Sequence, residues 1–285
     1  MHLLPAKDYS AYVAALLPSR TAALMRVMAR IGVGVREVEG MNAALLQILS
    51  GDPMTQRELA ALLKPRVEKK LLPWMNLSWN VFRPALIAGL VCYGPNRGRE
   101  TTLVRVERWL PKLQAIDEGR AKERLLRNYL RTYAPAVLQD FCKWSGISVS
   151  EAKPLWRSLQ DEMVAVSVEG AEAFVLRDQL PELESGLPDS PVVCLLPGFD
   201  PYLLAHARKE HLVSARYYKR VYRSQGWISP VVLVNGRAAG VWSCKRQGRA
   251  FVVQTELFEK QPKAVLSAIK IEAEKVEGFA NNGRD

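Results

Sequence analysis

The chain has 285 residues, of which 48% are hydrophobic and 24% charged, and its 40 Lys and Arg outnumber its 29 Asp and Glu. This composition excludes a disordered or fibrous chain, and the length is enough for two or three small globular domains. A net charge of +11 favours a polyanionic partner, with nucleic acid first, over a basic surface that is only solvated.

The spacing of cysteine, histidine and glycine argues against metal and nucleotide sites. The four cysteines stand about fifty residues apart, without a paired motif, at Cys92, Cys142, Cys194 and Cys244. They are expected to be buried thiols in a reducing compartment rather than zinc ligands. His206 and His211 are five residues apart, a spacing that does not place them on one helix face. Gly32-Val33-Gly34 lacks the third glycine of a nucleotide loop, so no metal and no cofactor is expected.

The beginning of the chain is apolar from its first residues. Met1 to Pro5 include no charged side chain, and residues 8–29 are expected to be helical on both sides of Pro18. Because a domain that begins within its core suggests missing sequence upstream, residues 1–36 are interpreted as the remnant of an N-terminal helical region. No apolar run reaches about 18 residues and no signal peptide is recognisable, so a cytoplasmic protein without a membrane partner is expected.

Residues 37–112 carry the pattern of three helices followed by a hairpin. Apolar residues at helical spacing predict a helix over 38–50. Thr55 and Glu58 have the spacing of a capping box, which opens a second, short helix. A third helix is expected over 74–90.

Residues 113–186 repeat this plan. Asp117 is expected to cap a helix over 118–133, and a short second helix follows. A third helix is predicted over 150–163. Pro154 must then fall in the first turn of that helix, because further along it would remove a helical hydrogen bond.

Each of these two regions ends in a predicted hairpin. In the first, the strands Leu90–Tyr93 and Thr101–Val106 flank a turn with Arg97 and Arg99, where a wing would meet backbone phosphate. In the second, the turn is Glu169-Gly170, whose acidic tip argues against DNA contact. Three helices followed by a hairpin are typical of winged helix-turn-helix units, although many such units contact only protein.

Residues 179–189 have the composition of a linker. Residues 187–285 are then expected to form a β-richer C-terminal unit of related plan. Within it, Val192–Leu196 is predicted to be a buried strand and residues 201–224 to be helical.

The rest of this C-terminal unit is predicted to be a hairpin, a third strand and a helix. Asn235-Gly236 signals a type I′ turn, and a second turn at 246–249 leads to the third strand. An amphipathic helix follows over 262–276, before a frayed tail. The expected fold class is therefore mostly α with small β wings (α+β): tandem winged helix-turn-helix units with a β-richer C-terminal unit.

The basic charge is concentrated near the C-terminus. Between residues 187 and 257, ten basic side chains face four acidic ones, which leaves +6 of the total +11. Tyr217, Tyr218, Tyr222 and Trp227 are interleaved with them, a combination that favours nucleic acid. Phosphate contact is the prediction, and a solvated basic face is the alternative. The residues expected to contact DNA, including two in the first wing, are Arg97, Arg99, Arg208, Arg216, Lys219, Arg220, Arg223, Arg237, Lys245, Arg246 and Arg249.

Asp200 is a weak catalytic candidate. It is the one carboxylate in the apolar segment LLPGFDPYLL, and a buried carboxylate can hold a water or stabilise an oxocarbenium ion. The favoured alternative is structural. Asp is a preferred N-cap and Pro a preferred first helical residue, so Asp200 is expected to cap a helix that starts at Pro201.

Several stretches resemble one known family, the winged-helix DNA glycosylases of the AlkZ-like type. They are MHLLPAKDY, FRPALIAGLVCYGPNRGRETTLVRVERWL, LLRNYLRTYAPAVLQDFCKWSGIS, LLPGFDPYLLAH and SPVVLVNGRAAGVW. Ala134 stands where the family usually has glycine. The resemblance implies tandem winged helices around a basic channel. It also implies a metal-free bacterial repair enzyme that excises alkylated purines and unhooks interstrand crosslinks by hydrolysing the N-glycosidic bond.

The catalytic motif of that family, Gln-x-Gln or His-x-Gln, lies upstream of the segment that Met1–Asp8 resembles, so it is carried over to no residue here. The chain is interpreted as a fragment or as a shortened member that binds DNA without this chemistry. The expected function is that of a monomeric, nucleoid-associated protein that binds alkylated or crosslinked duplex DNA, and, if active, of a monofunctional DNA N-glycosylase. The alternatives are a non-catalytic DNA-binding protein (a regulator or a degenerate repair homologue) and an interaction scaffold.

Overall fold

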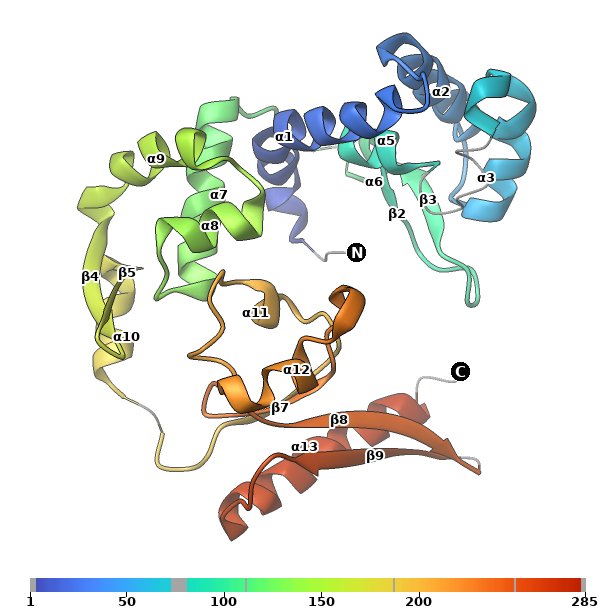
Figure 1. Cartoon of the computed structure of the whole chain (residues 1–285). Coiled ribbons are helices and arrows are strands. Elements are labelled where there is room, and N and C mark those ends of the chain that lie inside the picture. Colours follow the sequence, from blue (N-terminus) through green and yellow to red (C-terminus); the bar gives the residue numbers. More distant parts are fainter. Residues whose placement is uncertain (1–3, 73–80, 111, 187, 249, 283–285) are drawn as a thin grey trace. The chain divides into compact units, whose positions relative to one another are not determined.

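The computed structural model of the chain describes residues 4–72, 81–110, 112–186, 188–248 and 250–282. Helices and small antiparallel sheets alternate along the chain (Figure 1), as the sequence predicts. No helix within these ranges is long and apolar enough to cross a membrane. The chain folds as two compact units, which consist of Met1–Asn128 with Ser145–Ser148, and of Tyr129–Trp144 with Val149–Asp285.

The first unit is a helical body with one apolar core. Its main helices are α1 (Tyr9–Ala29), α2 (Val35–Ile48), α3 (Gln56–Leu63) and α5 (Arg83–Ile87). Met28, Leu45 and Leu59 are fully buried in the core that α1, α2 and α3 share. The capping box of α3 is confirmed, because the Thr55 hydroxyl accepts from the Glu58 amide at 3.2 Å and the Glu58 carboxylate accepts from the Thr55 amide at 2.8 Å.

A three-stranded antiparallel sheet completes the first unit. Its strands are β1 (Met54–Thr55), β2 (Val91–Tyr93) and β3 (Thr102–Arg105), in the order β1-β3-β2, and the short helix α6 (Val106–Trp109) follows. The predicted β2–β3 hairpin is confirmed. The two-residue β1 is too short to carry a periodic pattern. Residues 74–80 of the predicted third helix lie outside the described residues, and α5 begins just before Pro84.

The helix α7 (Glu118–Tyr133) begins in the first unit and ends in the second. Its predicted cap is confirmed, since an Asp117 carboxylate oxygen accepts from the Arg120 amide at 3.1 Å. The elements that follow it are α8 (Leu138–Ser145), α9 (Val149–Ser158) and the antiparallel pair β4 (Met163–Val168) and β5 (Ala171–Leu176).

Two predictions for this region are wrong. The helix predicted over 150–163 ends at Ser158, and Pro154 lies inside it rather than in its first turn. Met163 starts β4, where an apolar run rich in valine pairs with β5 instead of extending the helix. The predicted linker over 179–189 contains a short helix, α10 (Leu180–Glu184), whose first turn includes a proline with a backbone angle suited to that position.

A four-stranded antiparallel sheet dominates the C-terminal part of the second unit. The strands are β6 (Val193–Leu196), β7 (Val231–Val234), β8 (Arg237–Gln247) and β9 (Ala250–Leu257), in the order β6-β7-β8-β9. The helix α13 (Lys263–Asn282) packs along β6 and β9 (Figure 1). Asn235 and Gly236 have φ angles of 46° and 81°, which confirms the predicted type I′ turn.

The helix predicted over 201–224 does not form as one element. The segment contains two four-residue helices, α11 (Pro201–Leu204) and α12 (Tyr218–Val221), and residues 205–214 between them are not helical. The prediction of a frayed tail is also wrong up to Asn282. There, the Asn281 side-chain oxygen accepts from the Phe251 amide at 2.8 Å and fixes the last turn of α13 to β9.

Candidate nucleic-acid interface

Asp200 caps α11. Its carboxylate oxygen accepts from the Tyr202 amide at 2.9 Å, and Pro201 occupies the first helical position. The sequence predicts this cap. The hydrogen bond engages the carboxylate with the chain's own backbone, which is the geometry of a structural residue.

The predicted DNA-contacting residues of 201–224 lie on several short elements rather than on one helix face. Arg216 precedes α12 and lies over the Tyr217 ring, with the guanidinium carbon 5.3 Å from the ring centroid. Tyr217 itself stacks on Phe258, with centroids 4.5 Å apart and ring planes 12° apart. Tyr217 therefore packs within its own unit, whereas the neighbouring Tyr218 is exposed.

Three of the predicted residues are held in ion pairs. Arg97 pairs with Glu58 at 2.8 Å, within the first unit. Arg220 pairs with Glu256 at 2.6 Å. Arg237 pairs with Glu169, the acidic residue at the tip of the β4–β5 hairpin.

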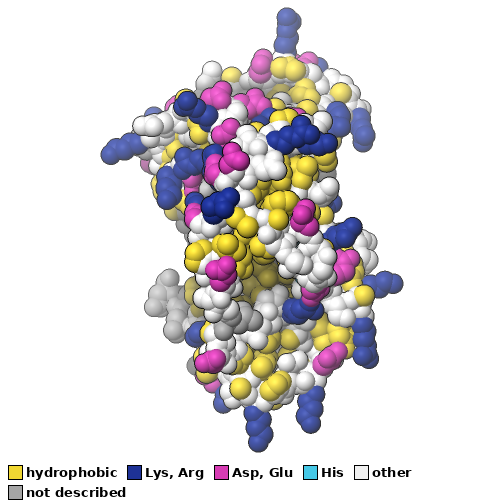
Figure 2. Space-filling model, turned by 90° about the vertical axis from the view of Figure 1, so that its left-hand side faces the viewer, with side chains coloured by type: hydrophobic (Ala, Val, Ile, Leu, Met, Phe, Trp, Pro, Cys, Tyr) yellow, Lys and Arg dark blue, Asp and Glu magenta, His cyan; other side chains and the backbone are white. Residues whose placement is uncertain are grey.

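Five predicted cations are exposed and make no side-chain hydrogen bond, ion pair or ring contact to another described residue. They are Arg99, Arg208, Lys219, Arg223 and Lys245. An exposed cation without a protein partner has the most to gain from a phosphate. Figure 2 shows a face on which Lys and Arg are interspersed with Asp and Glu.

The turn between β8 and β9 is exposed and basic. Arg246 Nε donates to the Gly248 carbonyl at 3.0 Å within the turn, and Lys245 is exposed beside it. Arg249, also predicted to contact DNA, lies outside the described residues. The long β8–β9 hairpin thus carries two described cations at its tip (Figure 1).

The second unit contains a buried polar cluster that the sequence does not predict. Asp140, which is 6% exposed, accepts hydrogen bonds from the Val137 amide at 2.9 Å and from the Ala207 amide at 2.8 Å. The rings of His206 and His211 meet edge to face at 4.6 Å between centroids. The five-residue spacing excludes a shared helix face, but the non-helical segment 205–214 brings the two rings together.

Burial shifts the pKa of the ionisable side chains in and beside this cluster. Burial lowers the pKa of both His206 and His211, and the nearby Asp140 opposes this shift. Burial also lowers the pKa of Lys209 to about 8, and its ammonium donates to the Leu203 carbonyl at 2.8 Å. No three metal-binding side chains gather anywhere in the described part of the chain.

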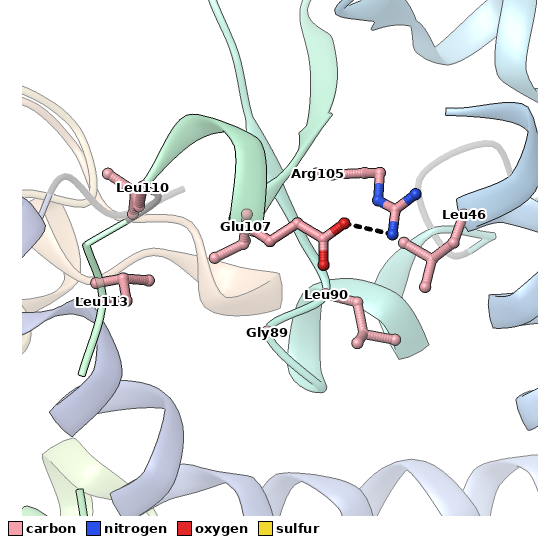
Figure 3. A pocket seen from close by; sticks show the side chains of 8 residues that line it. Leu46, Gly89, Leu90, Arg105, Glu107, Leu110 and Leu113 are labelled. Carbon is pink, nitrogen blue, oxygen red and sulfur yellow. Dashed lines mark ion pairs between the residues drawn. The ribbon is translucent and has the colours of Figure 1, made fainter. Parts of the chain in front are cut away.

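A hollow of about 290 Å³ lies in the first unit, between α2, the turn that follows α5, and the segment that begins at the end of β3. Half of the lining residues are leucines, and the ion pair of Arg105 and Glu107 lies across the hollow (Figure 3). The leucines are Leu46, Leu90, Leu110 and Leu113. None of the predicted DNA-contacting residues lines this hollow.

Comparisons with known proteins identify the family. The family described as DNA glycosylase AlkZ-like matches residues 1–279. The Interstrand DNA cross-link repair glycosylase of Streptomyces sahachiroi is 34% identical over 227 residues, which are 74% of this chain and 59% of that relative. The solved structure of Streptomyces sahachiroi DNA glycosylase AlkZ has a TM-score of 0.78 and 27% identity, and covers 99% of this chain and 76% of its own. The matched part thus spans about three fifths of the curated relative. The chain belongs to the AlkZ-like DNA glycosylase family.

Proposed function

We propose that this chain binds duplex DNA that carries an alkylated purine or an interstrand crosslink, as the recognition step of a repair glycosylase. The observation that carries the proposal is the family match over residues 1–279. The reaction of such an enzyme is hydrolysis of the N-glycosidic bond of the modified base. The relative from Streptomyces sahachiroi bears the name of a crosslink repair glycosylase, which supports crosslinked DNA as one substrate.

Tandem winged-helix units are the proposed scaffold for this binding. In residues 37–112, the order α2, β1, α3, α5 and then the β2–β3 hairpin, with β1 paired to β3, supports such a unit. In residues 113–186, three helices precede the β4–β5 hairpin. Residues 187–285 would form the β-richer third unit, and residues 1–36 a helical region ahead of the first.

The proposed phosphate contacts fall into two groups. Arg99, Arg208, Lys219, Arg223 and Lys245 are the stronger candidates, because each is exposed and no ion pair or ring contact with another described residue competes for it. Arg97, Arg220 and Arg237 rank lower, because a phosphate must displace a carboxylate that already neutralises them. Phosphate contacts are also proposed for Arg249, for Arg216, which lies over the Tyr217 ring, and for Arg246, which donates within its own turn.

A salt titration of duplex binding tests the proposal. If about five cations contact phosphates, the logarithm of the association constant should fall with the logarithm of salt concentration with a slope of about −4 to −5. Binding that is absent, or that does not respond to salt, would contradict the proposal and favour an interaction scaffold.

A non-catalytic DNA-binding protein is the second candidate function. It is favoured by the engagement of Asp200, the one catalytic candidate that the sequence offers, in the cap of α11. A regulator should prefer one sequence and bind as a symmetric dimer, whereas a monomeric damage-binding protein should prefer a lesion in any sequence. Binding competition between these DNAs, with the stoichiometry measured by sedimentation, separates the two.

A further inference from the structure

Two exposed aromatic rings meet on the surface of the second unit. Phe199 is 43% exposed and Trp227 is 56% exposed. Their centroids are 5.1 Å apart and their planes are perpendicular within a few degrees, at 85°. An edge-to-face contact covers one face of one ring, so both faces of the other ring are left uncovered by this partner.

The backbone that presents Phe199 is strained and closely packed. Its φ angle is 62°, a region that bulky side chains rarely occupy. Just before it, Gly198 packs so closely on the second loop that a Cβ there would lie 2.9 Å from the Ile228 carbonyl oxygen. Strain of this kind persists where the surrounding structure imposes it, and it is concentrated at functional sites. Here it turns an apolar ring outward.

A tight turn presents Trp227. Gln225 and Gly226, immediately before it, have φ angles of 58° and 75°. The turn is closed by the Arg223 amide, which donates to the Trp227 carbonyl at 2.7 Å. The closure places Arg223 opposite Trp227 across the turn, and the Arg223 side chain is exposed without an ion pair to any described residue.

Single exposed apolar residues are common on protein surfaces, and Trp109 and Phe279 are examples in this chain. The pair of Phe199 and Trp227 differs from them in three ways. Its rings come from two separate loops, both loops use positive φ angles, and the residue whose backbone pairs with Trp227, Arg223, is an exposed cation without a described ion-pair partner. A flat aromatic surface next to a guanidinium matches a nucleobase and its phosphate.

We propose that Phe199 and Trp227 form a stacking site for a DNA base that has left the duplex stack, with Arg223 on its phosphate. This inference rests on the proposed function and adds to it a position for an unstacked nucleobase. A base that is damaged or has lost its pairing partner costs less to unstack, so such a site would favour lesions over intact duplex.

The test compares two duplexes of the same sequence, one fully paired and one in which a single adenine lies opposite an abasic site. Binding is followed by fluorescence anisotropy of an end label. Trp227→Ala and Phe199→Gly are expected to lose about tenfold in affinity for the duplex with the unpaired adenine, in line with stacking on one aromatic ring. Their affinity for the paired duplex should change by less than about twofold, because phosphate contacts remain.

Two controls accompany these variants. Trp109→Ala removes a tryptophan of similar exposure, 49%, from the first unit and should leave both affinities unchanged. Phe199→Gly introduces the residue that tolerates a positive φ angle, so its melting temperature should equal or exceed that of the wild type. A loss of affinity in this variant therefore reports the ring and not the fold.

The outcomes separate the two proposals. If the wild type binds neither duplex, the proposed function and the stacking site both fail. If the wild type binds and both variants bind the two duplexes as tightly, the stacking site alone is wrong. A third outcome is that the wild type sediments as a dimer, Trp227→Ala sediments as a monomer, and both bind DNA equally tightly. The ring pair is then a contact between two copies of the chain, which also overturns the stacking site.

Discussion

Asp200 illustrates how a residue that is prominent in the sequence can have a local structural task. Because its carboxylate caps α11, replacing it with alanine should lower stability by about 1 kcal/mol, the usual cost of losing an N-cap acceptor. Asp200→Asn keeps a side-chain oxygen and should cost much less. Thermal melting of both variants, with DNA affinity measured on folded protein, checks this. An equal and large loss of DNA affinity in both variants at unchanged stability would instead assign the charge a role in the site.

The paired histidines predict a dependence of stability on pH. Burial lowers the pKa of His206 and His211 in the folded chain, whereas in the unfolded chain it is about 6.5. As the pH falls below about 6.5, the unfolded chain binds protons that the folded chain does not, so stability is lost in that direction. Of the charged groups near the pair, Asp140 raises the pKa of both histidines and Lys209 lowers it.

The melting temperature should therefore fall between pH 7 and pH 5, and this fall should be smaller in His206→Gln and in His211→Gln. Differential scanning calorimetry of the three proteins across that range measures the effect. All three proteins contain the same carboxylates. Parallel curves of melting temperature against pH would therefore show that the histidines do not contribute.

Arg223 and Arg237 form a matched pair of arginines for testing the phosphate contacts. Arg223 is exposed without a described ion-pair partner, whereas Arg237 pairs with Glu169. Arg223→Ala should reduce the salt dependence of duplex binding by about 0.9 in the logarithmic slope. Arg237→Ala should change it much less. Equal slopes for both variants and the wild type would mean that the face around Arg223 is only solvated.

At the scale of elements, the sequence predicts those structures that local contacts determine. The capping box at Thr55, the cap at Asp117 and the Asn235-Gly236 turn all form as predicted, because each depends on residues within three positions. The segment 201–224 fails for the opposite reason. Its apolar and basic residues fit a helix, but its middle is held by a hydrogen bond from Ala207 to Asp140, 67 residues away in sequence. No local pattern reveals such a contact.

The residues of the candidate site likewise include some features that the sequence predicts and others that only long-range contacts determine. The sequence is enough to locate the cluster of basic residues, since their number and spacing are sequence properties. It does not tell which of them are neutralised, because Arg220 and Arg237 meet carboxylates that are 36 and 68 residues away. The contact between Phe199 and Trp227 depends on two loops with positive φ angles and is equally invisible to periodicity.

The contact of Asp140 with Ala207 gives a prediction for the element it fixes. Asp140→Asn places an NH2 group, which cannot accept a hydrogen bond, against one of the two buried backbone donors, and should cost about 1–3 kcal/mol. Amide hydrogen exchange should become faster over the non-helical segment 205–214, which includes residues 205–213, more than elsewhere in the second unit.

Asp178→Asn is the control for that variant. Asp178 pairs with Arg131 on the surface, where its side chain is 62% exposed, and its loss should cost less than about 1 kcal/mol. If Asp140→Asn is no more destabilising than Asp178→Asn, the buried carboxylate does not hold the segment 205–213 in place.

At the scale of the whole molecule, family membership rests on features spread along the chain. Motifs from both units contribute to the resemblance, and the family match extends over residues 1–279. The fold alone would not give this result, because one fold can serve unrelated functions. The division into four regions, with boundaries at 36, 112 and 186, stays a prediction from sequence.

The most direct test of lesion-directed DNA binding uses duplexes of several sequences, each with or without one N7-methylguanine. Affinities are measured at several salt concentrations, and abasic sites are scored on the same samples after alkaline cleavage. We expect salt-sensitive binding that is tighter for the methylated duplex in every sequence, and release of the base in the same samples would assign the hydrolysis to groups of this chain. Equal affinity for both duplexes, or affinity that follows the sequence rather than the lesion, would contradict it.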